Sequence, residues 1–108
     1  MAFTYKVLGQ SSPTAATNTD LYTVPASTSA VVSTLAVCNR GVSTSFRVAV
    51  RPAGATIADE QYIVYDTYVN QYDAVFLTLG ITLAATDVVT IYTDAATLSF
   101  SLFGSEIA

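Results

Sequence analysis

The sequence contains no histidine, no tryptophan and a single cysteine, Cys38. Without histidine, the chain lacks the commonest general base and the usual activator of a serine or cysteine nucleophile, and most zinc-site designs are excluded. One cysteine cannot form a disulfide within the chain, and we expect Cys38 to be a small buried hydrophobe. The sequence also has no glycine-rich phosphate loop. We therefore expect no enzymatic activity and no cofactor.

Charged residues are scarce. Four Lys and Arg and eight Asp and Glu make up 11% of the chain and give a formal net charge of −4, whereas typical soluble domains are ~25% charged. Nucleic acids attract clusters of Lys and Arg, so these few cations argue against a nucleic-acid partner. Because 52% of the residues are hydrophobic, we expect part of the surface to be apolar, and such area usually marks an interaction site.

The chain length, 108 residues, fits one domain. No apolar stretch approaches the ~20 residues that a helix needs to span a bilayer. The segment Met1–Lys6 lacks the basic region and apolar run of a secretory signal. We therefore expect a protein that is made in the cytoplasm and has no membrane partner.

Alternation with a period of two residues predicts β-strands. In Phe46–Arg51 the apolar residues alternate with arginines, which is typical of a half-buried strand. Turn signals recur at roughly 8–12-residue spacing, among them Asn39-Arg40-Gly41 and Leu79-Gly80, each of which predicts the end of a strand. The pattern predicts an all-β fold, either a single antiparallel β-sandwich or a jelly-roll-like barrel of roughly eight strands.

The first twenty residues differ from the remainder. Gly9–Thr14 is small, polar and contains a proline, which indicates a loop. Phe3 and Tyr5 alternate with polar residues and favour an added strand, which pairs either within the domain or with a neighbour. We therefore expect an N-terminal arm or edge strand at 1–20 and a β-sandwich domain at 21–108.

Tyrosine and arginine supply the candidate contact residues. Tyrosine is enriched at interfaces because it combines a large apolar ring with a hydroxyl. In a regular strand Tyr62 and Tyr68 share one face and Tyr65 the other, so one of these faces is expected in the core. Core packing of the tyrosines and solvated strand faces for the arginines are the alternatives. The candidate contact residues are Phe3, Tyr5, Tyr62, Tyr65, Tyr68, Tyr72, Arg40, Arg47 and Arg51.

The carboxylates are the remaining groups that could carry chemistry. Asp59 and Glu60 are adjacent, with Asp66 and Asp73 further along. Two carboxylates are the minimum for glycoside hydrolysis, and several can hold calcium. The spacing lacks the dense Asp, Asn and Gly pattern of a calcium loop. We expect solvated turns and strand ends and no metal, with calcium at a subunit contact and catalysis as the alternatives.

Several strand and turn segments resemble a pattern found in small virion proteins of tailed bacteriophages: Leu21–Ala26, Ala30–Leu35, Val37–Gly41, Phe46–Pro52 and Gly80–Leu83. The resemblance extends from about Leu21 to the end of the chain and concerns folding positions, so it transfers no functional residue. It implies a non-enzymatic structural protein of the virion. Such a protein is either a capsid cement (decoration) protein or a component of the tail, baseplate or fibre.

The expected function is that of a capsid cement protein that bridges capsomers and stabilises the head, where many modest contacts add through multivalency. We expect a homo-oligomer, with a trimer favoured, bound to the major capsid protein or another virion protein. The arm at 1–20 could reach a neighbour by strand addition, and Arg40, Arg47 and Arg51 could pair with an acidic capsid surface. The alternatives are a tail, baseplate or fibre subunit and a carbohydrate- or receptor-binding β-sandwich module.

Overall fold

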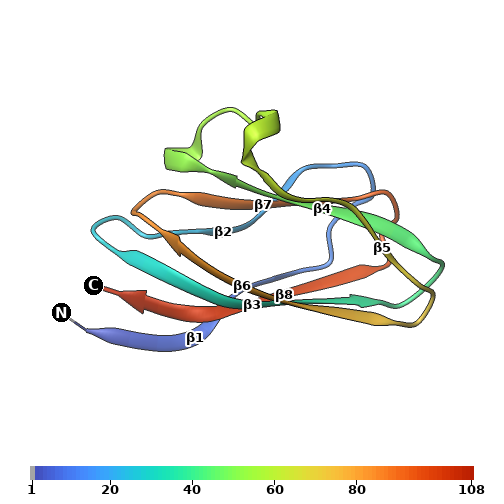
Figure 1. The fold of residues 1–108 in the computed structure, drawn as a ribbon, viewed down its shortest axis with the longest axis horizontal. Coiled ribbons are helices and arrows are strands. Elements are labelled where there is room, and N and C mark those ends of the chain that lie inside the picture. Colours follow the sequence, from blue (N-terminus) through green and yellow to red (C-terminus); the bar gives the residue numbers. More distant parts are fainter. Residues whose placement is uncertain (1) are drawn as a thin grey trace.

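The fold is known from a computed structural model, which describes residues 2–108. Within these residues the chain forms eight β-strands and two short 3-10 turns (Figure 1). The strands are β1 (Phe3–Ser11), β2 (Thr19–Thr23), β3 (Ser29–Asn39), β4 (Thr44–Arg51), β5 (Tyr62–Val69), β6 (Ala74–Leu83), β7 (Val88–Thr93) and β8 (Leu98–Ile107). The turns η1 (Pro52–Gly54) and η2 (Asp59–Gln61) lie between β4 and β5. The predicted all-β fold is confirmed.

The strands form two four-stranded antiparallel sheets that pack face to face. Sheet A has the order β1-β8-β3-β6 and sheet B the order β2-β7-β4-β5. Thus β1 pairs with β8, β2 with β7, β3 with β6 and β4 with β5. The chain therefore resembles one long hairpin with its tip between β4 and β5. Successive strand pairs along this hairpin belong alternately to sheet A and sheet B. This is the connectivity of a jelly roll.

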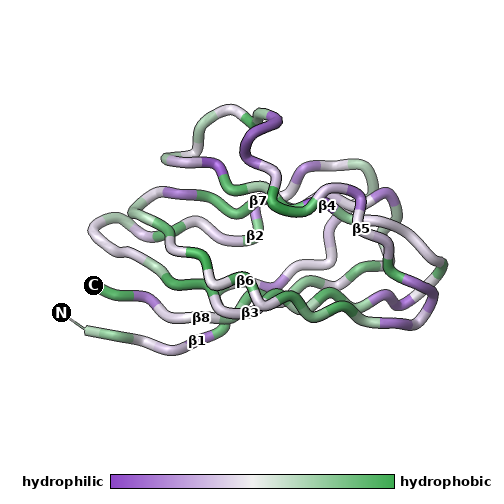
Figure 2. The backbone as a smooth tube through the Cα atoms, viewed as in Figure 1, coloured by the Kyte–Doolittle hydropathy of each residue, from purple (hydrophilic) through white to green (hydrophobic). Residues whose placement is uncertain are grey.

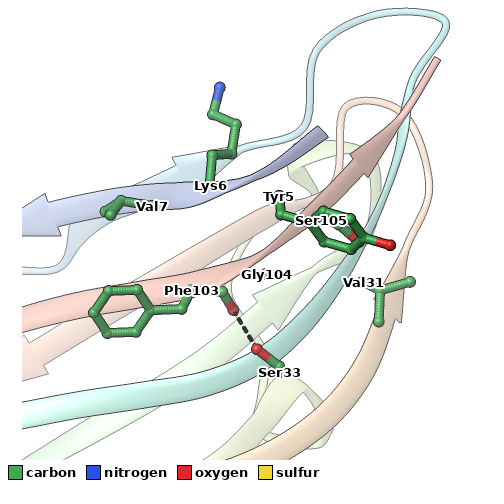
Figure 3. A pocket seen from close by; sticks show the side chains of 8 residues that line it. All are labelled: Tyr5, Lys6, Val7, Val31, Ser33, Phe103, Gly104 and Ser105. Atoms are coloured by element: carbon green, nitrogen blue, oxygen red, sulfur yellow. Dashed lines mark hydrogen bonds between the residues drawn. The ribbon is translucent and has the colours of Figure 1, made fainter. Parts of the chain in front are cut away.

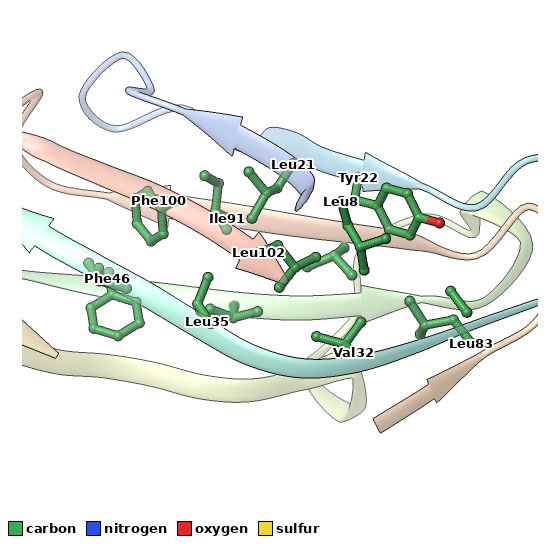
Figure 4. Packing of buried hydrophobic residues seen from close by; sticks show 14 of the residues in the cluster. Leu8, Leu21, Tyr22, Val32, Leu35, Phe46, Leu83, Ile91, Phe100 and Leu102 are labelled. Atoms are coloured by element: carbon green, nitrogen blue, oxygen red, sulfur yellow. The ribbon is translucent and has the colours of Figure 1, made fainter. Parts of the chain in front are cut away.

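The core fills the space between the two sheets. Phe46 of β4 and Phe100 of β8 meet at its centre, with ring centroids 5.8 Å apart in an edge-to-face arrangement. Leucine, valine and isoleucine side chains from both sheets surround them (Figure 4). In β4 the residues Phe46 and Val48 point inward and Arg47 points outward, as the alternation predicts. Figure 2 shows apolar strands in both layers and a hydrophilic segment at η2.

The structure corrects several local predictions. Leu79-Gly80 does not end a strand: β6 runs through it, and Gly80 adopts a left-handed conformation with φ of 61°. The register between β3 and β6 shifts at this point, so a bulge accommodates the glycine without ending the pairing. Cys38 is not buried but exposed, because Val37 on the same strand points into the core and the next residue must face outward.

The expected arm at 1–20 consists of two parts in the structure. β1 forms an edge of sheet A and pairs with β8 from Phe3 to Ser11, so the prediction of a loop at Gly9–Thr14 is wrong for its first three residues, which continue the strand. After a connection, β2 begins at Thr19 in sheet B. Beyond β1, Ala2 and Ala108 exchange two backbone hydrogen bonds of 3.0 Å, so the described ends of the chain lie side by side. Across residues 2–108, no helix has the length and hydropathy required to cross a membrane.

Candidate functional site

The outer face of sheet A is the most unusual surface of the domain. Residues that are directly opposite in an antiparallel pair point to the same side, so the register of the four strands arranges the outward side chains in rows. Neighbouring rows on this face are Tyr5, Ser105, Val31 and Thr82; then Val7, Phe103, Thr34 and Thr78; then Gln10, Ser101, Ala36 and Phe76. The face therefore presents apolar, hydroxyl and amide groups.

Among residues 2–108, one charged side chain lies at this face: Arg40, which follows β3 and donates a hydrogen bond of 2.8 Å to Ser99 Oγ at one end of the face. Lys6 and Glu106 belong to β1 and β8, but the register aligns them with the inward-pointing Val32 and Ala30. Figure 3 shows Lys6 on the opposite side of β1 from Tyr5. The other charged residues lie in sheet B, in the β4–β5 connection or in turns between strands. Apart from Arg40 at one end, the outer face of sheet A is therefore uncharged.

Large apolar side chains protrude from this face. Tyr5 is 84% exposed and Phe76 is 73% exposed, while Phe3 is also exposed at the end of β1. A shallow hollow lies across β1, β8 and β3, and its side chains include Tyr5, Val31 and Phe103 (Figure 3). At its edge the Ser33 hydroxyl donates a hydrogen bond of 3.2 Å to the Phe103 carbonyl. Aromatic groups of this kind gain stability when another surface covers them.

Sheet B differs because its outer face is charged and partly covered. The connection between β4 and β5 lies on the outer side of sheet B, whereas sheet A forms the opposite boundary of the molecule (Figure 1). The Ala53 amide in this connection donates a hydrogen bond of 2.9 Å to Asp87 Oδ1. Beneath it Ala49 and Thr90 are buried although they point outward from the sheet. The uncovered layer of the sandwich is therefore sheet A.

The tyrosines of β5 share one face, which corrects the expectation from a regular strand. The register between β4 and β5 shifts twice, between Phe46 and Val48 and again between Val48 and Ala49. Each shift resets the alternation. As a result the rings of Tyr62 and Tyr65 meet at 5.0 Å between centroids, and the Tyr65 ring packs against the outward-pointing Arg47. Tyr68, opposite the outward-pointing Ser45, lies on the same face.

Arg47 is held tightly in this aromatic cluster. Its guanidinium carbon lies 4.2 Å from the centroid of Tyr65 and 4.6 Å from that of Tyr92. Its Nε donates a hydrogen bond of 2.7 Å to Asp66 Oδ1, and this bond raises the pKa of Arg47 above its usual range. Asp66 adopts a left-handed backbone with φ of 56°, a conformation that aspartate tolerates better than most residues. The charge of Arg47 is thus neutralised within the chain.

The structure does not bring the other candidate contact residues together. Arg40 lies in the turn after β3, where its Nε donates to Ser99 Oγ at 2.8 Å and Nη2 to Ser12 Oγ at 2.6 Å. Arg51 lies on sheet B, with Nη1 at 3.8 Å from Asp20 Oδ1. Tyr72 lies in the turn between β5 and β6 and is 75% exposed. The three arginines therefore occupy separate parts of the surface.

The carboxylates singled out in the sequence are also dispersed. Asp59 and Glu60 lie in η2, while Asp66 pairs with Arg47. Asp73 Oδ1 accepts a hydrogen bond of 2.8 Å from the Ala74 amide at the start of β6. Within residues 2–108, no three Cys, Asp or Glu side chains form a group that could hold a metal ion.

A cluster that sequence analysis missed joins the two sheets at one end. The Tyr22 hydroxyl of β2 donates a hydrogen bond of 2.6 Å to Glu106 Oε2, and Lys6 Nζ lies 3.3 Å from Glu106 Oε1. The bond from Tyr22 lowers the pKa of Glu106, as does the nearby ammonium of Lys6. Burial and the same carboxylate raise the pKa of Tyr22. These residues are 84 and 100 positions away from Glu106, so no local pattern connects them.

The Glu106→Gln substitution tests this cluster. Because folding lowers the pKa of Glu106, its stabilisation is fully present above the ordinary value of 4.5 and is lost as the pH falls through the folded value. We expect the substitution to reduce the free energy of unfolding at neutral pH by about 1 kcal/mol. Urea denaturation at a series of pH values should show this difference shrinking below pH 4.5. The matched control is Glu60→Gln in the exposed η2 turn; an equal loss in both variants would contradict the assignment.

Comparison of the chain with protein-family models and with curated proteins finds no match. The strongest candidate among the described surfaces is the outer face of sheet A, which is apolar in large part, uncharged except for Arg40 at its end and without a covering segment (Figure 1).

Proposed function

We propose that this protein is a non-enzymatic structural subunit that works by packing against neighbouring protein subunits. Its specific role is that of a capsid cement protein of a tailed bacteriophage, which bridges capsomers and stabilises the head. The observation that carries the proposal is the outer face of sheet A, with Tyr5 and Phe76 protruding from a surface that is uncharged except for Arg40 at its end.

The physical chemistry of this face suits permanent contact. Covering a charged surface costs free energy because each ion loses its hydration, and the outer face of sheet A presents one ion, Arg40, at its end. Covering exposed aromatic rings contributes ~25 cal/mol for each Å² of apolar surface removed from water. Each contact is modest after the entropy of association is subtracted. Many copies on a repetitive lattice would nevertheless hold firmly through multivalency.

Two further observations support a place in the virion. Segments of the chain resemble small virion proteins of tailed bacteriophages, among them Phe46–Pro52 and Gly80–Leu83. The jelly-roll connectivity is also used by viral capsid domains, although lectin domains share it. The second observation is an analogy of fold, and function must be argued from the surface. The proposed location is the virion, after synthesis in the host cytoplasm.

Binding to phage heads tests the proposal. Heads that lack the protein are mixed with the purified chain, and the bound copies are counted by quantitative mass spectrometry. We expect wild-type protein to bind in many copies per head and to raise the temperature at which heads lose their DNA. Tyr5→Glu places a charge on the outer face of sheet A and should reduce binding by at least ~10-fold, because an unpaired charge would be covered.

The matched control is Tyr68→Glu, which makes the same change on the exposed face of sheet B. Equal binding by wild type and Tyr68→Glu is expected. Loss of binding by the Tyr68→Glu variant alone would move the contact to sheet B. Absence of wild-type binding to heads, with protein found on purified tails, would replace the cement role by that of a tail, baseplate or fibre subunit.

A carbohydrate- or receptor-binding module is the second candidate, because Tyr62, Tyr65 and Tyr68 share one face. Sugars stack on free ring faces, yet Arg47 covers Tyr65 and the Tyr62 ring contacts it as well. Tyr68 is the member of this group that remains most exposed. A glycan screen separates the candidates: tight binding of one sugar that Tyr68→Ala abolishes would favour the module over the structural subunit.

A further inference from the structure

We propose that a second copy of this chain covers the outer face of sheet A, so that two sandwiches stack sheet against sheet around a two-fold axis. The inference rests on the proposed function, in which this face packs against a neighbouring subunit, and it names that subunit as a second copy. The dimer then binds the head through surface outside this face, and Tyr5→Glu impairs head binding because it breaks the dimer. Its evidence is the charge, the extent and the relief of the face.

Charge selects the partner. The chain has a formal net charge of −4, and its carboxylates lie in sheet B, in the connections between strands and, for Glu106, between the sheets. Two copies that met through the charged exterior would have to remove these carboxylates from water. Two copies that meet through the outer face of sheet A bring no carboxylates together. A partner with a charged surface would lose hydration over most of this face and find a counter-charge only at Arg40 at its end.

The extent of the face matches a small dimer interface. Four strands spaced ~4.8 Å apart and about eight residues long at ~3.3 Å per residue cover roughly 500 Å² in projection. Protruding side chains such as Tyr5 and Phe76 make the accessible area larger than this footprint. The total approaches the ~800 Å² that each partner buries in a standard interface. The whole face, rather than one corner, must therefore take part.

The shape of the face is complementary to that of a second copy of the same face. Phe76 protrudes from β6 at one edge, whereas the hollow lies across β3, β8 and β1 toward the other edge. Between them run the small outward side chains Ala36 and Ser101, which lie in the same row as Phe76. A two-fold axis that lies in the plane of the interface, midway between Phe76 and the hollow, places Phe76 of each copy over the hollow of the other. Such an interface is isologous and closes as a dimer.

Cys38 provides an internal reporter. It is exposed on the outer face of sheet A, in the row of Ser99 and Ala74, and it is the only cysteine of the chain. Stacking of two copies would cover its thiol. Alkylation of Cys38 should therefore slow as the protein concentration rises through the dissociation constant of the dimer, and this measurement requires no substitution.

Sedimentation velocity and native mass spectrometry of the full chain over a range of concentrations test the inference. We expect wild type to be dimeric and Phe76→Asp to weaken the dimer by at least ~100-fold, since the interface would then contain two unpaired carboxylates. Tyr72→Asp is the matched control, because Tyr72 is as exposed as Phe76 but lies in a turn; its dimer should be as stable as that of wild type. Circular dichroism verifies that both variants fold.

The outcomes separate this inference from the proposed function. A wild-type monomer at all concentrations, with Cys38 alkylation independent of concentration, overturns the inference. If Tyr5→Glu still impairs head binding in that case, the proposed function survives. A trimer, or a dimer that Phe76→Asp leaves intact, overturns the two-fold arrangement on sheet A. A dimer that Phe76→Asp disrupts, with no binding to heads, supports the inference and contradicts the proposed function.

Discussion

Replacing Asn39 by aspartate should reduce the free energy of unfolding by about 3–5 kcal/mol, although the two side chains have nearly the same shape. Asn39 is 2% exposed at the end of β3. Its Nδ2 donates to the carbonyl oxygens of Val42, Val69 and Asn70 at 2.8, 3.2 and 3.2 Å. The substitution replaces this donor by an oxygen, so a carboxylate would face three carbonyl oxygens in a site that water does not reach.

The other half of the Asn39 amide explains why the position is sensitive. Its Oδ1 accepts hydrogen bonds of 3.0 Å from the Gly41 amide and from the Thr97 hydroxyl. One side chain thus ties together the turns that follow β3, β5 and β7. Buried polar groups left without partners cost about 1–3 kcal/mol each, so damage at Asn39 should affect all three turns.

Urea denaturation of Asn39→Asp and wild type measures the effect, with Asn18→Asp on an exposed loop as the control. The control should lie within about 0.5 kcal/mol of wild type. Burial without a counter-charge raises the pKa of the new carboxyl, so the deficit of Asn39→Asp should shrink as the pH falls through that raised value toward the ordinary value of ~4. A deficit under about 1 kcal/mol at neutral pH would contradict the hydrogen-bond network described above.

Truncating Phe100 to alanine should cost about 3–5 kcal/mol, whereas the same truncation of Phe76 should cost less than about 0.5 kcal/mol in the monomer. Phe100 is 1% exposed and packs edge-to-face against Phe46 between the sheets. Its removal would leave a cavity that a close-packed sandwich cannot collapse to fill. Phe76 points away from the core, so its ring is covered only when another protein lies on sheet A.

Denaturation of both variants at low protein concentration, where the monomer prevails, measures the contrast. At high protein concentration, association should stabilise wild type but not Phe76→Ala. The difference in free energy of unfolding between the two proteins should therefore grow with concentration. Equal costs for Phe100→Ala and Phe76→Ala in the dilute monomer would show that Phe76 belongs to the core, and the argument for a bare outer face of sheet A would then fail.

Some features of the molecule follow from local sequence. Phe46, Val48 and Arg47 have the orientations that strict alternation predicts, because a strand directs successive side chains to opposite faces. The scarcity of charge likewise indicated an apolar surface before its position was known. Local alternation failed at Tyr62 and Tyr65, where two register shifts turn both rings to one face. A bulge depends on the partner strand, so the sequence of β5 contains no clear signal for it.

The amino-acid sequence by itself determined the strands, the all-β class and the absence of histidine chemistry, because these depend on composition and on neighbours along the chain. The tertiary structure decided which apolar surface is left exposed. Only strand pairing aligns Lys6 and Glu106 with the core and brings Tyr22 to them, and only pairing of β1, β8, β3 and β6 joins uncharged residues into one face. The physical reason is that alternation along one strand determines the face on which a residue lies, whereas its neighbours on that face come from other strands, as much as 100 positions away in the sequence.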